Sequence, residues 1–137
     1  MRAVLDPNVI ISAVLAPGGA PARVLRAGLE GAYDLIASPL LLAELERALA
    51  YPKLRRRIPA GDAAALVDLV QSNARMVDDP LGPPVVRSLD PDDDYLIALA
   101  AEARAVLVSG DRHLLQLDRR LLIHAPGKFL DLLADRP

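Results

Sequence analysis

Four carboxylate residues occupy positions from which they could act on one ligand. Asp6 and Asp111 each follow a short apolar run, whereas Glu44 and Asp94 lie in segments with helical spacing. Carboxylates gathered at one point would repel one another unless a hard cation neutralised them. Such an oxygen-only site predicts Mg²⁺ or Mn²⁺. One or two such ions can activate water and stabilise a leaving oxygen, so the pattern favours metal-assisted hydrolysis of a polyanion.

Two of these acids stand beyond predicted buried strands. The apolar run 3–5 ends at Asp6, and the run 105–108 is followed shortly by Asp111. In parallel α/β sheets the carboxyl ends of the strands lie at one edge, where reactive sites are usually found. We therefore expect both acids at that edge. An alternative is that Asp6 only caps a helix that begins near Asn8.

Glu44 lies on a predicted helix over residues 39–50. Ser38 precedes a proline at the first helical position, which is typical of a helix start. Glu44 is close to the apolar side of this helix, where a carboxylate is costly to bury unless it is paired or bound to a metal. The alternative is an acid at the rim of the core that pairs with Arg47, three positions later.

The densest acidic segment is Asp90-Pro91-Asp92-Asp93-Asp94. Asp90 followed by proline predicts a helix start, and acids in the first turn suit the positive end of the helix dipole. Capping alone does not require all of these acids. Asp94 shares a face with Ile97, so we expect its side chain on the core side of the helix, pointing toward the strand ends. Asp93 lies one position earlier and could take its place.

The length of 137 residues fits one domain, residues 1–137, and the absence of cysteine excludes cysteine chemistry. Alternating strand-like and helical segments favour a central, mainly parallel sheet. No apolar run approaches the roughly 20 residues of a membrane helix, and no signal peptide is recognisable, so we expect a cytoplasmic protein. His113 and His124 lack the paired spacing of a zinc helix, and we interpret both as structural or surface residues.

Overall charge does not favour nucleic-acid binding, because 16 basic and 18 acidic residues leave a net charge of −2. One phenylalanine, three tyrosines and no tryptophan make a base-stacking platform unexpected as well. The one concentrated basic run lies at residues 53–57. Its members Lys53, Arg55 and Arg56 could contact backbone phosphates, or the run could be only a solvated surface.

In their order and spacing, these segments resemble the PIN domain family of Mg²⁺-dependent ribonucleases, particularly bacterial VapC-like toxins. The resemblance covers nearly the whole chain and implies a three-layer α/β/α sandwich. The matching segments are Val4-Leu5-Asp6-Pro7-Asn8-Val9, Ser38-Pro39 to Leu49, Pro52-Lys53-Leu54, Asp90 to Ala100, and Val108-Ser109-Gly110-Asp111.

The resemblance also implies a role for the matching residues. The metal would be held by Asp6, Glu44, Asp94 and Asp111, with Asn8 and Ser109 as the groups that orient these ligands. The implied activity is cleavage of single-stranded RNA. The implied partners are a cognate antitoxin protein and a second copy of the chain in a homodimer.

Two other functions share parts of the pattern. Pro7 lies where the family usually has threonine or serine, and proline offers neither a hydroxyl nor a backbone N–H. A catalytically weakened module that keeps the fold and binds RNA or protein is therefore an alternative. A phosphatase that resembles the haloacid dehalogenases, with Asp6 as nucleophile, is disfavoured because Asn8 stands where a second aspartate would be needed.

Overall fold

The computed structural model describes residues 1–136, in which five strands form one sheet. The strands are β1 (Arg2–Leu5), β2 (Asp34–Ala37), β3 (Arg75–Met76), β4 (Val106–Val108) and β5 (Ile123–His124). They follow the order β3-β2-β1-β4-β5, and each neighbouring pair is parallel. The predicted central parallel sheet is confirmed, with the first strand at its middle.

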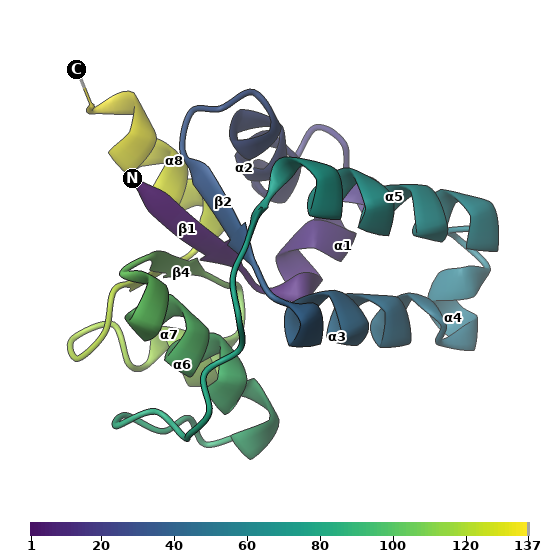
Figure 1. Ribbon diagram of the computed structural model, residues 1–137. Coiled ribbons are helices and arrows are strands. Elements are labelled where there is room, and N and C mark those ends of the chain that lie inside the picture. The colour runs from purple at the N-terminus through teal and green to yellow at the C-terminus, as the bar shows by residue number, and fades with distance from the viewer. Residues whose placement is uncertain (137) are drawn as a thin grey trace.

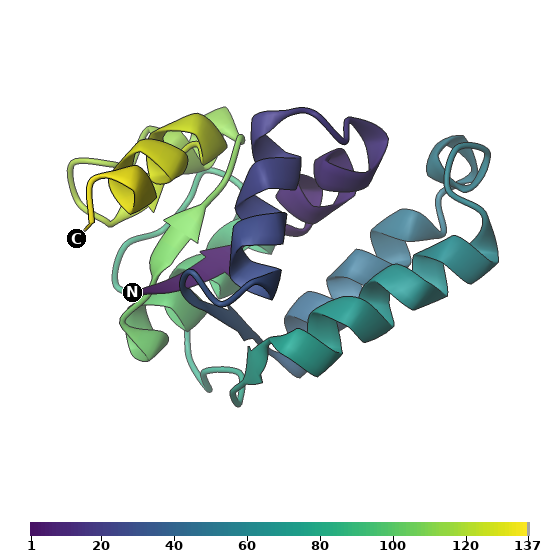
Figure 2. The same cartoon turned by 90° about the horizontal axis from the view of Figure 1, so that it is seen from above.

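Helices connect the strands and cover both faces of the sheet, as Figures 1 and 2 show. They are α1 (Pro7–Leu15), α2 (Ala20–Leu29), α3 (Pro39–Leu49), α4 (Pro52–Arg55), α5 (Ala60–Asn73), the 3₁₀ turn η1 (Pro91–Asp93), α6 (Asp94–Ala103), α7 (Arg112–Leu115) and α8 (Pro126–Ala134). α6 packs against β1 and β4 on one face, whereas α1, α2 and α8 pack together on the other. This arrangement is the expected three-layer α/β/α sandwich.

Two helices, α3 and α5, lie side by side and extend away from the sheet, with α4 joining their far ends (Figure 1). Among residues 1–136, no single helix is long and apolar enough to cross a membrane. α1 and α2 reach such a length and apolarity only together, and they meet at a bend of 107°.

The centre of the sheet is completely buried, because β1 has a strand on each side and helices above and below. Residues 3–5 are 0% exposed. A strand that is buried on both faces reads as a continuous apolar run, which is the pattern of Ala3-Val4-Leu5. Leu5 pairs in register with Val108 of β4, so the two strands end at the same level. The residues that follow them are therefore brought together.

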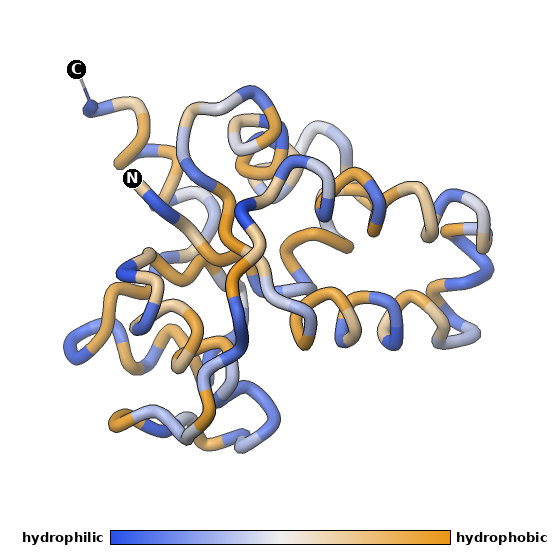
Figure 3. The backbone as a smooth tube through the Cα atoms, viewed as in Figure 1, coloured by the Kyte–Doolittle hydropathy of each residue, from blue (hydrophilic) through white to orange (hydrophobic). Residues whose placement is uncertain are grey.

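The core on the α2–α8 side is organised around Tyr33. Its ring meets Phe129 edge to face at a centroid distance of 5.0 Å, and its hydroxyl donates to the carbonyl oxygen of Val24 at 2.7 Å. Gly28 lies directly under the ring, because a Cβ at this position would be 2.7 Å from the Tyr33 hydroxyl oxygen. Figure 3 shows hydrophobic residues along the central strands and hydrophilic residues along the outer turns.

An irregular segment, residues 79–88, runs from the end of β3 to the turn before α6, and we call it the strap (Figure 1). Two carboxylates tie it down. Near its start, Asp79 Oδ2 accepts a hydrogen bond from the backbone N–H of Leu40 at 2.9 Å. At its end, the backbone N–H of Ser88 donates to Asp94 Oδ1 at 2.7 Å. The strap therefore bridges the start of α3 and the start of α6.

Candidate active site

Asp6 lies between the end of β1 and the start of α1, and it is 4% exposed. Its Oδ1 accepts from the backbone N–H of Asn8 at 3.0 Å, which makes it the cap of α1. Its Oδ2 accepts from the hydroxyl of Ser109 at 2.8 Å. Burial raises the pKa of Asp6, and these two hydrogen bonds oppose the rise. The carboxylate is therefore both a helix cap and a group fixed at the edge of the sheet.

Asp111 is linked to Asp6 through Ser109. The Ser109 hydroxyl, which donates to Asp6, also accepts from the backbone N–H of Asp111 at 3.0 Å. Asp111 in turn caps α7, because its Oδ1 accepts from the backbone N–H of His113 at 2.8 Å. The two acids that follow β1 and β4 thus share one small polar network, as expected from their positions beyond parallel strands.

Asp93 faces these two acids from the other side. The pKa of Asp93 is raised to about 7 by burial first and then by the negative charges of Asp6, Asp111 and Asp90. Its Oδ2 is buried and has no hydrogen-bond partner within residues 1–136. Asp93 completes a group of three carboxylates beyond the carboxyl ends of the two central strands.

Asp94 is placed differently from the sequence expectation. Asp94 lies on the buried side of α6 and is 9% exposed, but the strap covers α6 at this position. Its Oδ1 accepts from Ser88, and its Oδ2 is 3.8 Å from the Arg87 guanidinium. The expected helix start at Asp90 is a 3₁₀ turn, so α6 itself begins only at Asp94. The structure brings Asp93, not Asp94, to Asp6 and Asp111.

Glu44 is half-buried on α3 and forms an ion pair with the exposed Arg47, which is the alternative that the sequence left open. The Ser38 side chain caps α3, and Pro39 occupies its first position, as predicted. The charge of Glu44 still reaches the acidic edge, because it contributes, together with Asp6 and Asp93, to the raised pKa of Tyr95. Glu44 therefore borders the group of three carboxylates from α3.

The three carboxylates provide suitable donors for a divalent cation. Within residues 1–136, no group of three Asp, Glu, His or Cys side chains is already arranged to hold a metal ion. Rotation of the Asp93 and Asp111 side chains would have to bring their oxygens to the fixed Asp6 carboxylate. Carboxylate oxygens are the ligands that Mg²⁺ prefers, and the unpartnered Oδ2 of Asp93 is a buried acceptor that a cation would satisfy. The donor chemistry therefore fits the ion.

The predicted RNA-binding residues lie apart from the acids. Lys53 and Arg55 belong to α4, and Arg56 follows it, all three exposed to solvent. α4 stands at the far end of α3, whose 11 residues span about 16 Å (Figure 1). The structure therefore does not bring the basic run into the acidic group.

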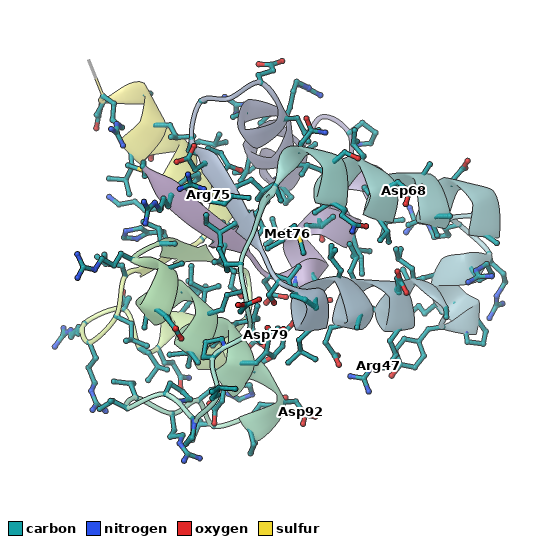
Figure 4. The ribbon with its side chains drawn as sticks, in the orientation of Figure 1. Arg47, Asp68, Arg75, Met76, Asp79 and Asp92 are labelled. Atoms are coloured by element: carbon teal, nitrogen blue, oxygen red, sulfur yellow. The ribbon has the colours of Figure 1, made fainter. Side chains whose placement is uncertain are left out.

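Two residues that the sequence patterns did not single out also lie at this edge. Asp79 is located where the strap passes the start of α3, and its Oδ1 is buried without a hydrogen-bond partner in the described chain (Figure 4). Tyr95 lies near Asp79, as well as near Asp6, Glu44 and Asp93. Asp79 comes shortly after β3, as Asp6 and Asp111 come after β1 and β4, so the strand-then-acid pattern could have found it.

Comparison with known proteins identifies relatives along most of the chain. A model of the PIN domain family matches residues 2–113, a range that includes Asp6, Asp93 and Asp111. The uncharacterized protein MJ1680 of Methanocaldococcus jannaschii is 30% identical over 118 residues, which cover 85% of this chain and 75% of that protein.

Two solved structures share the fold. PAE2754 from Pyrobaculum aerophilum has a TM-score of 0.68 at 20% identity, covering 99% of this chain and 91% of that chain. VapBC2 from Rickettsia felis, bound to a DNA fragment from its promoter, has a TM-score of 0.62 at 15% identity, covering 91% of this chain and 98% of that chain. At these identities, the similarity shows the architecture.

Proposed function

This chain belongs to the PIN domain family, and from that premise we propose that it is a Mg²⁺- or Mn²⁺-dependent endoribonuclease that hydrolyses phosphodiester bonds of single-stranded RNA. PIN domains are generally nucleases. The observation that carries the proposal is the group formed by Asp6, Asp93 and Asp111, in which one buried carboxylate oxygen lacks a partner. Carboxylates that repel one another at the reactive edge of a parallel sheet are suited to binding a cation.

In this proposal Asp6, Asp93 and Asp111 hold the metal, with Glu44 at the border of the site. Asp93 takes the role expected for Asp94, which instead anchors the strap. When bound, the cation supplies charge neutralisation and Lewis-acid activation of water. Ser109 keeps the Asp6 carboxylate in place, since it donates to one of its oxygens at 2.8 Å.

The basic run on α4 would bind RNA outside the acidic group. Because α4 lies at the far end of α3 from the strap, Lys53, Arg55 and Arg56 would contact phosphates of flanking nucleotides and not the cleaved bond. Their exposure suits this role, as none of them forms an ion pair within residues 1–136. They would supply affinity and orientation of the strand.

We further propose that the protein acts as the toxin of a toxin–antitoxin pair and forms a homodimer. The shared fold with VapBC2 supports this assignment, in line with the resemblance to VapC-like toxins. The test is co-expression with the product of the adjacent gene. Joint purification and inhibition of cleavage by that product would support the pairing, and an unaffected nuclease would argue against it.

A second candidate is a PIN module that binds RNA or protein without cleaving it. It is favoured by the position of Glu44, which pairs with Arg47 and does not join the three carboxylates. Pro7 gives it less support than the sequence suggested. Pro7 is buried at the first position of α1, and Asp6 already accepts hydrogen bonds on both oxygens without a hydroxyl at position 7.

The deciding experiment is cleavage of a mixed-sequence single-stranded RNA in EDTA, Mg²⁺ or Mn²⁺. Asp6→Asn, purified in parallel, controls for contaminating nuclease. We expect metal-dependent cutting by the wild type and none by the variant, with the metal-free stability of the variant unchanged or higher because a repelling charge is removed. Full activity in Asp6→Asn would exclude the proposed site, and binding without cutting would favour the second candidate.

A further inference from the structure

An apolar pocket of about 340 Å³ lies between α6 and the β5 edge of the sheet, and we call it the α6–β5 pocket. α6 packs against β1 and β4, and the pocket opens where the same face of the sheet continues to β5. Leu107 and Ile123, which are neighbours in register on β4 and β5, line it from the sheet. Ile97 and Ala101 line it from α6, and Leu122 lines it from the turn before β5. Leu122 is 66% exposed, so the rim of the pocket includes an apolar side chain that the fold does not cover.

Two arginines, Arg104 and Arg120, are the charged residues that line this pocket in the part of the chain that the structure describes. Both are exposed. Neither guanidinium forms an ion pair or a hydrogen bond within residues 1–136, whereas Arg2 donates to the carbonyl oxygen of Ala103 at the same end of α6. The two cations lie beside an aliphatic surface in a chain whose net charge is −2. They make the rim of the pocket complementary to a ligand that carries carboxylates.

Arg104 also has a backbone conformation that its residue type does not favour. Its φ of 53° and ψ of 48° lie in the left-handed region, and it is the one non-glycine residue with a positive φ among residues 1–136. The conformation ends α6, because the backbone N–H groups of Arg104 and Ala105 both donate to the carbonyl oxygen of Ala100. Glycine adopts it without steric cost, and the bonds that end the helix do not use the arginine side chain. An arginine at such a position points to a role for its guanidinium.

The chemistry of the lining favours a peptide over a nucleic acid. Apart from the two arginines, the side chains that line the pocket are all aliphatic. A nucleobase carries donors and acceptors along its edge, and burying them against such side chains without partners costs free energy. A leucine or isoleucine side chain has no polar atoms and gains free energy by burial. Carboxylates on either side of it would pair with Arg104 and Arg120, because a guanidinium binds this planar group through two N–H donors.

We propose that the α6–β5 pocket docks an acidic peptide segment of a partner protein, with one aliphatic side chain in the pocket and flanking carboxylates on Arg104 and Arg120. This role does not depend on the proposed nuclease activity. Asp6 and Asp111 follow the carboxyl ends of β1 and β4, whereas Arg104 precedes β4 at its amino end. A segment docked here therefore leaves the acidic group open to RNA, and it recruits the protein without inhibiting it.

The test uses fluorescein-labelled peptides, each with one leucine, isoleucine or valine between two pairs of glutamates. A peptide with serine at the central position is the control. Binding to the full chain is measured by anisotropy, and the site is located by changes in amide chemical shifts. We expect the best aliphatic peptide to bind about tenfold or more tightly than the serine peptide, because only the former buries an apolar side chain. The shift changes should cluster at Ala101, Leu122 and Ile123.

Arginine variants test the two charges. Arg120→Ala should weaken binding of the best peptide by about twofold to fivefold, which is the range of an exposed ion pair. Arg119→Ala is the matched control, because Arg119 is an exposed neighbour that does not line the pocket. Arg104→Gly should weaken binding to the same extent and yet raise the Tm, since glycine relieves the left-handed backbone. Saturation with peptide should leave the rate of RNA cleavage unchanged.

The inference would be overturned if none of the aliphatic peptides bound, or if the serine peptide bound as tightly as the best of them. Equal losses for Arg119→Ala and Arg120→Ala would also overturn it, and so would a lower Tm for Arg104→Gly, which would assign that side chain to the fold. Displacement of the peptide by a single-stranded RNA oligonucleotide that shifts the same amides would reassign the pocket to nucleic acid. A protein that cuts no RNA refutes the nuclease proposal alone, because every binding measurement here is independent of cleavage.

Discussion

Replacing Asp93 with asparagine should stabilise the metal-free protein at alkaline pH and flatten the dependence of its stability on pH. Burial, followed by the charges of Asp6 and Asp111, raises the pKa of Asp93 from 3.8 to about 7. The folded chain therefore binds this proton more tightly than the unfolded chain does. The stability that the proton supplies is fully present below about pH 4 and is lost as the pH rises through about 7.

The magnitude of this loss follows from the difference between the two pKa values. At about 1.4 kcal/mol per pH unit, it corresponds to about 4 kcal/mol of unfolding free energy for a fully buried group. Asp93 is only partly buried, and solvent screening lowers the contribution, so we expect a loss of about 1–2 kcal/mol between pH 4 and pH 8. Asp93→Asn avoids the loss. At pH 8 its Tm should exceed that of the wild type by roughly 3–8 °C.

The assay is thermal and urea unfolding in EDTA from about pH 5 to pH 8, followed by circular dichroism. Asp92→Asn is the matched control, because Asp92 is exposed in the same turn and does not face the acidic group. Adding Mg²⁺ should raise the Tm of the wild type more than that of Asp93→Asn, because the wild type keeps the charge that binds the cation. The placement of Asp93 against Asp6 and Asp111 would be refuted if Asp93→Asn gained no stability at pH 8, or if Asp92→Asn gained as much.

The remaining predictions concern the RNA path and the core. Arg55→Ala combined with Arg56→Ala should weaken RNA binding. It should also reduce the slope of log affinity against log salt by about 0.7 for each phosphate that the variant no longer neutralises. An unchanged slope would show that the basic run is only a solvated surface. Gly28→Ala should destabilise the fold by about 1–3 kcal/mol in urea unfolding, because its Cβ would collide with the Tyr33 ring. Gly61→Ala, at a helical position with nothing within 4 Å of its Cβ, should instead be neutral or stabilising by up to about 1 kcal/mol, and equal effects of the two would contradict the close packing of α2.

Much of the fold could be predicted from local patterns. Short apolar runs that end at acids marked β1 and β4, because strands buried on both faces carry no polar positions. Ser38-Pro39 marked the start of α3, because a side-chain cap and a proline suit that position. The short helices α4 and α7 were not predicted, since four residues are too few for a hydrophobic period. The irregular strap contains no strand, so the pairing of strands gives no constraint on its path.

The order of residues along the chain is enough to bring Asp6 and Asp111 together. Parallel strands end at the same edge, so an acid after each central strand arrives there whatever the intervening chain does. The choice between Asp93 and Asp94, by contrast, depends on tertiary contacts. Their spacing on an ideal helix favoured Asp94 as the acid near Asp6. In the structure a 3₁₀ turn precedes α6, and the Asp94 carboxylate accepts a hydrogen bond from the Ser88 N–H of the strap. Asp93 is therefore the acid that lies near Asp6.

The positions of Asp79 and Tyr95 depend in the same way on contacts between segments that are distant in sequence. Asp79 reaches the acidic edge because its carboxylate accepts a hydrogen bond from the backbone N–H of Leu40, which lies 39 residues earlier. Tyr95 packs partly against the hydrophobic core, and only the fold places it beside Asp79 in the cavity between the strap and α6. Local spacing fixes which side of an element a residue occupies, whereas what lies against that side is set by packing between elements.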